Sequence, residues 1–168
     1  NMVNITSKFD SGNIEIINAN DPGNIRLKIR KDNNADHFQW FYYRVSGAKD
    51  TPLRMIILNA GEASYPEGFE DYMVRASYDK EEWFMVPTKF DGKVMTIKHH
   101  PEHNAVFYAY FAPYSYERHL SFIHNIQFSP LISYESIGQT VEGRELDLLT
   151  IGNEHEEALK IWVIARQH

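Results

Sequence analysis

Residues 25–30 read "IRLKIR", in which aliphatic residues alternate with cations at every position. Successive side chains of a β-strand point to opposite faces, so this pattern places Ile25, Leu27 and Ile29 on one face and the three cations on the other. Burying each aliphatic side chain contributes roughly 1.5–3 kcal/mol before conformational entropy is counted. The stretch therefore predicts a strand with one face in a hydrophobic core.

Comparable runs recur along the first two thirds of the chain, at residues 38–45, 53–58, 72–77, 83–87, 94–98 and 105–111. Turn signals separate them, and the strongest is Asp91-Gly92, because glycine accepts the positive φ that tight hairpins require. Short strands at this spacing, with no long helical pattern between them, indicate an antiparallel β-sandwich. We place the end of this domain at Pro113, so that it comprises residues 1–113.

The periodicity changes after Pro113. Ser115 can cap a helix with Tyr116, Leu120 and Ile123 on one stripe, and Pro130 is expected to end it. Residues 133–140 and 144–151 flank Glu142-Gly143, which predicts a second hairpin. The continuous apolar run 161–165 is typical of a strand that is covered on both faces, as at the centre of an α/β sheet. Residues 114–168 are therefore expected to begin a second, α/β domain.

Composition excludes several classes of protein. The formal net charge is −6 and no Lys/Arg-rich block occurs, whereas nucleic-acid binding needs clustered positive charge. No apolar run approaches the ~20 residues that cross a bilayer, and no signal-peptide pattern opens the chain, so we expect a soluble cytoplasmic protein with no membrane partner. The absence of cysteine rules out disulfides and thiolate metal sites. The sequence leaves the oligomeric state open.

Two segments carry a resemblance to a known family. "IGQTVEGRELDLL" (137–149), followed by "IWVIARQH" (161–168), resembles the opening of the zinc metallocarboxypeptidases related to carboxypeptidase A. In that family a hairpin of this kind precedes a central strand, which leads into a zinc-binding loop. With "APYSYERH" (112–119), the segments most resemble the cytosolic carboxypeptidase subfamily, which places a β-sandwich before its catalytic domain. The expected fold is therefore mainly β, with the sandwich followed by the first helix and strands of the α/β metallocarboxypeptidase domain.

The resemblance implies a zinc enzyme that hydrolyses C-terminal bonds of peptide or protein tails, including C-terminal glutamate in eukaryotic members. His168 corresponds to the first zinc ligand, just beyond the carboxyl end of a strand, where α/β sheets gather functional groups. A catalytic zinc needs about three protein ligands and an open position for water. The other ligands, the general-base glutamate and the substrate-binding arginines would follow His168. No catalytic residue is therefore expected within this chain, which alone should be inactive.

Other residues invite functional interpretations that we consider weaker. The stretch 99–103, "HHPEH", resembles a metal cluster, but Pro101 prevents a helix there and an exposed turn is expected. Glu142 and Arg144 are interpreted as structural residues of the hairpin, and His119 and His124 as packed or hydrogen-bonded helix residues.

The aromatic runs 38–43 and 107–111 could form a platform for sugars, although core and inter-domain packing fit them better. The alternative function is therefore a non-catalytic sandwich module that binds a peptide, a glycan or a neighbouring domain.

Overall fold

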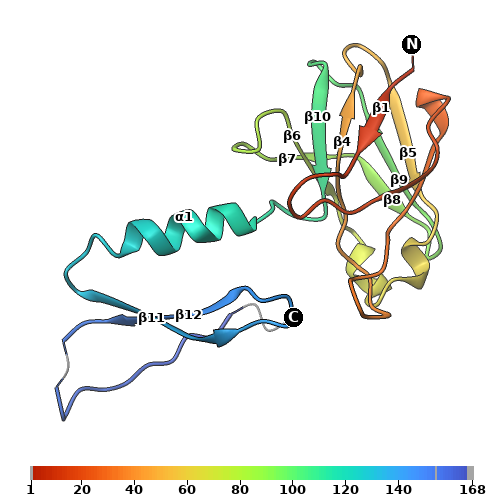
Figure 1. Cartoon of the computed structure of the whole chain (residues 1–168). Coiled ribbons are helices and arrows are strands. Elements are labelled where there is room, and N and C mark those ends of the chain that lie inside the picture. The colour runs from red at the N-terminus through yellow and green to blue at the C-terminus, as the bar shows by residue number, and fades with distance from the viewer. Residues whose placement is uncertain (1, 154, 166–168) are drawn as a thin grey trace. The chain divides into compact units, whose positions relative to one another are not determined.

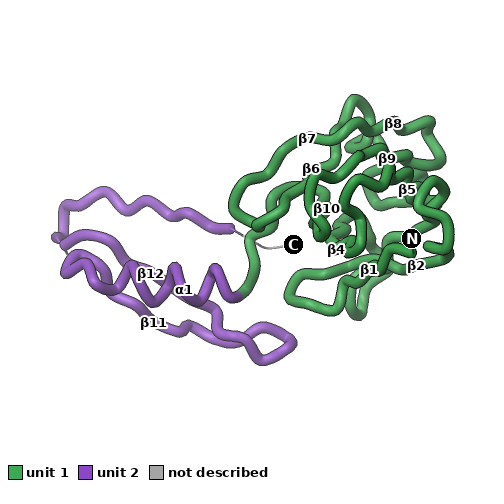
Figure 2. Tube along the Cα trace, turned by 90° about the horizontal axis from the view of Figure 1, so that it is seen from above, with its two compact units in different colours: residues 1–116 green, residues 117–168 purple. Residues whose placement is uncertain are grey.

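A computed structural model describes residues 2–153 and 155–165. The chain divides into two compact units, residues 1–116 and 117–168 (Figure 2). Unit 1 contains two five-stranded sheets. The first has the order β1 (Asn4–Thr6), β4 (Tyr42–Ser46), β10 (Ala105–Ala109), β6 (Val74–Ser77) and β7 (Phe84–Val86) (Figure 1). The second has the order β2 (Glu15–Asn18), β3 (Ile25–Lys28), β5 (Leu53–Ile57), β9 (Met95–His99) and β8 (Thr88–Phe90).

The opening stretch forms β3 as its alternation predicts. Ile25 and Leu27 are fully buried, whereas Arg26 and Lys28 are exposed. The alternation continues to Arg30, but the strand ends at Lys28 because the next backbone groups bond elsewhere. The side-chain amide of Asn59 accepts from Ile29 N–H and donates to Ile29 C=O, both at 2.9 Å. The Asn59 side chain thus satisfies the backbone groups of Ile29 that a neighbouring strand would otherwise bond.

The two sheets share one core and are joined by polar contacts inside it. Tyr43 of β4 donates its hydroxyl to the Met55 sulfur of β5 at 3.2 Å. The Tyr108 hydroxyl of β10 lies 2.7 Å from Nδ1 of His99 in β9. Burial holds the pKa values of both tyrosines above their usual range, so both remain neutral hydroxyls. The sheets therefore form the expected sandwich around a continuous core.

The chain changes sheets at Pro87. β7 pairs with β6 in the first sheet, and β8, which follows Pro87 directly, pairs with β9 in the second. Proline has no N–H to donate to a ladder, so the pairing of β7 with β6 ends before it, whereas the Pro87 carbonyl already accepts from Lys98 N–H of β9 at 3.0 Å. A hairpin forms at Asp91-Gly92 as predicted, but its first strand is β8 and not the predicted run 83–87, which supplies β7 of the other sheet. Asp91 Oδ1 accepts from the N–H groups of Lys93 and Val94, both at 2.8 Å, and Gly92 has a φ of 90°.

Two details of the sandwich differ from the sequence-based expectation. β3 and β5 pair in parallel, although the other named pairs of the described chain are antiparallel. The segment between them includes β4 of the opposite sheet, so β5 re-enters the second sheet in the same direction as β3. The strand predicted at 38–45 begins only at Tyr42, because Phe38 N–H bonds to Ser64 Oγ at 3.0 Å rather than to a strand.

Unit 2 contains the predicted helix and hairpin. Helix α1 spans Tyr116–Ile126 and so ends before Pro130. Strands β11 (Ile132–Gln139) and β12 (Glu145–Ile151) pair antiparallel, with a register shift between Ser136 and Gln139. Among the described residues, no helix is long and apolar enough to span a bilayer.

The strand expected at 161–165 is not formed. These residues have no regular structure, and the side chains of Ile161 and Val163 are 86% and 89% exposed. A strand is held by hydrogen bonds to a neighbour. Within the described parts of the chain, β11 and β12 pair only with each other, and no segment pairs with residues 161–165. Residues 161–165 thus have the composition of a central strand, but within the described chain they lack the hydrogen bonds to a neighbouring strand that would hold them in one.

Candidate functional site

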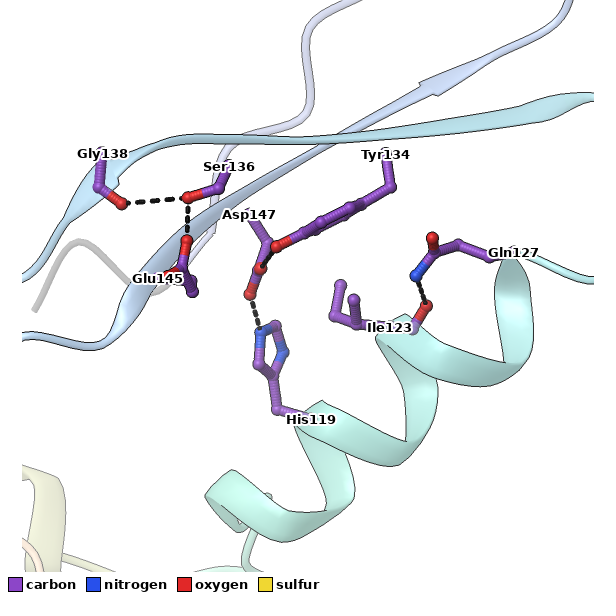
Figure 3. Close-up of polar contacts among 8 residues, drawn as sticks. All are labelled: His119, Ile123, Gln127, Tyr134, Ser136, Gly138, Glu145 and Asp147. Atoms are coloured by element: carbon purple, nitrogen blue, oxygen red, sulfur yellow. Dashed lines mark hydrogen bonds and ion pairs between the residues drawn. The ribbon is translucent and has the colours of Figure 1, made fainter.

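The Asp147 carboxylate connects α1, β11 and β12, the regular elements among the described residues of unit 2. Asp147 lies on β12, and its side chain is 10% exposed. Oδ2 lies 2.6 Å from His119 Nε2 of α1, and Oδ1 accepts from the Tyr134 hydroxyl of β11 at 2.9 Å (Figure 3). The Asp147 side chain of β12 thereby links α1 and β11 to its own strand.

The register of the hairpin explains this arrangement. Tyr134 pairs with Leu149 and Ser136 pairs with Asp147, so Tyr134 and Asp147 are diagonal neighbours on one face. Such neighbours are within reach of a long side chain. A second polar contact on the hairpin joins the Ser136 hydroxyl to the Glu145 carboxylate (Figure 3).

The hairpin turn is closed by its own residues. Thr140 N–H donates to Arg144 C=O at 2.7 Å, and Arg144 N–H donates to Thr140 Oγ1 at 3.0 Å. Gly143 has a φ of 78°, a left-handed conformation that glycine adopts without a side-chain clash. In the segment Glu142-Gly143-Arg144, the glycine therefore occupies the position of the turn that needs a positive φ, and the backbone of Arg144 takes part in closing the turn.

We expect Asp147→Asn to weaken unit 2 by about 1–2 kcal/mol, because the Tyr134 hydroxyl and the partly buried His119 imidazole lose their shared charged acceptor. Amide hydrogen exchange of α1, β11 and β12 measures this directly as faster exchange in those elements. Glu135→Gln is the matched control, since Glu135 lies on the same hairpin with an exposed side chain. Equal exchange rates in the two variants would show that Asp147 does not hold the elements together.

The predicted site residues have different outcomes. His168 lies outside the described residues. His119 is hydrogen-bonded, as expected for a structural helix residue. The His124 ring packs edge-on against the Phe128 ring, and the two ring centroids are 5.4 Å apart. His100, Glu102 and His103 are exposed, as expected for a turn. His99 differs from that expectation, because it is the last residue of β9 and is partly buried, with Nδ1 2.7 Å from the Tyr108 hydroxyl. Across residues 2–153 and 155–165, no group of three or more histidine, aspartate or glutamate side chains is arranged to hold a metal ion.

Sequence reasoning did not identify the role of Asp147 or Tyr134. A signal was present, because Asp147 is flanked by Leu146, Leu148 and Leu149. A carboxylate within such an apolar strand generally needs a partner. The partners themselves depend on the strand register and on the packing of α1, which local sequence does not specify.

Two family models match successive parts of the chain. Residues 5–111 match the cytosolic carboxypeptidase N-terminal domain, and residues 119–168 match the zinc carboxypeptidase family. The first match covers the β-sandwich, and the second covers most of α1, the hairpin and the segment that leads to His168.

Solved structures agree with these matches. A metallo-carboxypeptidase from Burkholderia cenocepacia is 46% identical, with a TM-score of 0.90 over 95% of this chain and 42% of its own. A metallo-carboxypeptidase from Pseudomonas aeruginosa, in complex with (2-guanidinoethylmercapto)succinic acid, is 40% identical, with a TM-score of 0.93 over 98% of this chain and 44% of its own. An uncharacterized Zymomonas mobilis protein is 42% identical over 98% of this chain and 42% of its own length.

This chain thus spans less than half of each of those relatives. Its sandwich and the segment that follows match the same family in the same order. The chain belongs to the zinc metallocarboxypeptidases, in the cytosolic carboxypeptidase subfamily, and its matched residues correspond to the N-terminal portion of that family's proteins.

Proposed function

We propose that this sequence is the N-terminal portion of a zinc-dependent carboxypeptidase that removes residues from the C-terminal ends of peptides or protein tails. The observation that carries the proposal is the order of the two matches, an N-terminal domain model over residues 5–111 and a zinc carboxypeptidase model over residues 119–168. The gap between the two matches supports the domain boundary that we propose near Pro113. The subfamily name supports a cytoplasmic location.

His168 is the proposed first zinc ligand in this protein. Its support is the resemblance of residues 137–149 and 161–168 to the family's hairpin, strand and zinc loop, and the second family match extends to His168. A neutral imidazole suits zinc, but one imidazole is too few, because a catalytic site needs about three protein ligands. Among the described residues, no group of three or more histidine, aspartate or glutamate side chains is arranged to hold a metal ion. We therefore assign the complete zinc site to a longer protein.

Zinc, when bound, would supply a water of lowered pKa and a Lewis acid for the scissile carbonyl. The contribution of this chain is to place His168. Asp147 holds α1 and the hairpin together, and residues 152–165 lead from β12 to the proposed ligand. The 168-residue chain, with one proposed ligand and no proposed general base, should neither retain zinc nor hydrolyse peptides.

The test compares the 168-residue chain with a longer protein that continues past His168. We expect about one zinc per molecule after dialysis, and release of the last residue from a peptide ending in glutamate, for the longer protein alone. The same peptide with an amidated C-terminus is the control substrate, because carboxypeptidases act at a free carboxylate. Tightly held zinc or hydrolysis in the 168-residue chain would contradict its proposed inactivity. A longer protein without either property would contradict the carboxypeptidase assignment.

A further inference from the structure

A pocket of about 360 Å³ lies at one end of the sandwich in unit 1. The turn that follows β6 contributes Tyr78, Asp79 and Glu82 to its lining, β7 contributes Phe84, and the end of β9 with the turn behind it contributes His99, His100 and Glu102. Three of these side chains are carboxylic acids, and no lysine or arginine lines the pocket. An adjoining pocket, which shares the two histidines, instead contains Arg54 and Lys98.

Three aromatic rings form one wall of this pocket. The Tyr78 and Phe84 ring centroids are 5.3 Å apart, those of Phe84 and His99 are 5.6 Å apart, and those of Tyr78 and His99 are 6.2 Å apart. All three side chains are partly buried and line the pocket. Clustered aromatic rings present electron-rich faces, which attract organic cations.

Hydrogen bonds fix the two turns that carry the acidic groups. Asp79 Oδ1 accepts from the N–H groups of Glu82 and Glu81 at 2.9 and 2.8 Å, and these bonds hold the pKa of Asp79 below its usual value. The Tyr78 hydroxyl accepts from Glu102 N–H at 3.0 Å, which ties the turn behind β9 to the turn behind β6. The Asp79 carboxylate is therefore held within its turn, and the backbone positions that carry Glu82 and Glu102 are fixed at the pocket lined by the aromatic rings.

The imidazole in the wall does not oppose a cation. His99 Nδ1 lies 2.7 Å from the Tyr108 hydroxyl, and His99 Nε2 lies 3.5 Å from the Tyr78 hydroxyl. Burial lowers the pKa of His99, so the ring is neutral near pH 7. The pocket thus combines negative charge, aromatic faces and a neutral imidazole.

We propose that this pocket binds an organic cation, the guanidinium or ammonium group of an arginine or lysine side chain. Aromatic faces and carboxylates together select such a group over neutral or acidic ones, and the volume accommodates a side-chain head with part of its stem. The proposal concerns the sandwich alone, and it stands whether or not the longer protein is a carboxypeptidase.

The experiment titrates the ¹⁵N-labelled 168-residue chain with Nα-acetyl-arginine methylamide and follows two-dimensional NMR spectra. The citrulline analogue is the neutral probe of nearly the same shape. We expect the arginine probe to shift the amide signals of residues 78–84 and 99–102, and the citrulline probe to leave them unchanged. Equal shifts with both probes would overturn the proposal, as would no shift with either probe at millimolar concentration.

Variants separate specific recognition from general attraction to an acidic protein. Glu82→Gln and Glu102→Gln should each weaken binding about two- to fivefold, as expected for exposed charges. Phe84→Leu should weaken it by a similar factor, provided that its spectrum stays dispersed. Glu62→Gln removes the same charge from an exposed residue outside the pocket and should change nothing. Loss of affinity in Glu62→Gln equal to that in Glu102→Gln would show that binding is non-specific.

Discussion

Leu27→Ala is expected to lower the free energy of unfolding of the sandwich by about 2–5 kcal/mol. Leu27 is fully buried in β3, which lies between β2 and β5 in the second sheet. Truncation removes apolar contacts and leaves a cavity that close-packed neighbours fill only in part. Because small domains are stable by only about 5–15 kcal/mol, this loss would shift the unfolding midpoint strongly.

Urea unfolding measured by tryptophan fluorescence tests this expectation. The chain has three tryptophans, of which Trp162 is exposed in unit 2, so a Trp162→Phe background makes the signal report unit 1. Arg26→Ala is the matched control on the same strand, because Arg26 points to solvent and should change stability by less than about 0.5 kcal/mol. Similar midpoints for the two variants would refute the assignment of Leu27 to the core.

Local patterns predicted the elements that depend on local chemistry. Alternation identified β3, and Asp91-Gly92 identified the β8–β9 hairpin. The change of period after Pro113 identified α1 and the hairpin that follows it. Each of these rests on side-chain burial, turn geometry or helix periodicity within a few residues.

Features that depend on distant partners were not accessible in the same way. The parallel pairing of β3 with β5 follows from the route of the chain through the opposite sheet, which alternation does not encode. Residues 161–165 have the composition of a central strand, but the described chain offers no neighbour for them. Strand composition indicates how a segment would pack, whereas strand formation also requires a hydrogen-bonding partner.

The candidate sites also differ in whether local sequence could predict them. His168 could be proposed from sequence because a motif with fixed order carries it. The Asp147 contacts and the cation pocket could not, because each requires side chains from separate elements to converge. In the pocket, a turn behind β6 meets a turn behind β9 through the hydrogen bond between Glu102 N–H and the Tyr78 hydroxyl. The "HHPEH" stretch by itself suggests metal chemistry, whereas the structure places His99, His100 and Glu102 in the lining of the pocket.

His168→Ala in the longer protein is expected to have the largest functional effect. If His168 is a ligand as we propose, its loss removes one of the about three protein ligands that a catalytic zinc needs. Zinc affinity should then fall by more than about 100-fold, since removing even an outer partner of a ligand costs about 10–100-fold. Peptidase activity should fall with the zinc content. Metal analysis after dialysis measures the first effect, and release of a C-terminal residue measures the second.

His155→Ala is the matched control for this prediction. His155 is an exposed histidine in the segment between β12 and His168, and its Nδ1 accepts only a local bond from Glu157 N–H at 3.2 Å among the contacts described. Its removal should leave both zinc content and activity unchanged. If His168→Ala retains stoichiometric zinc and full activity, His168 is not a ligand. If His155→Ala loses zinc to the same extent, the loss reflects damage to the segment. His155 does not correspond to a position in the family's zinc loop, so equal losses would give His168 no specific role as a ligand.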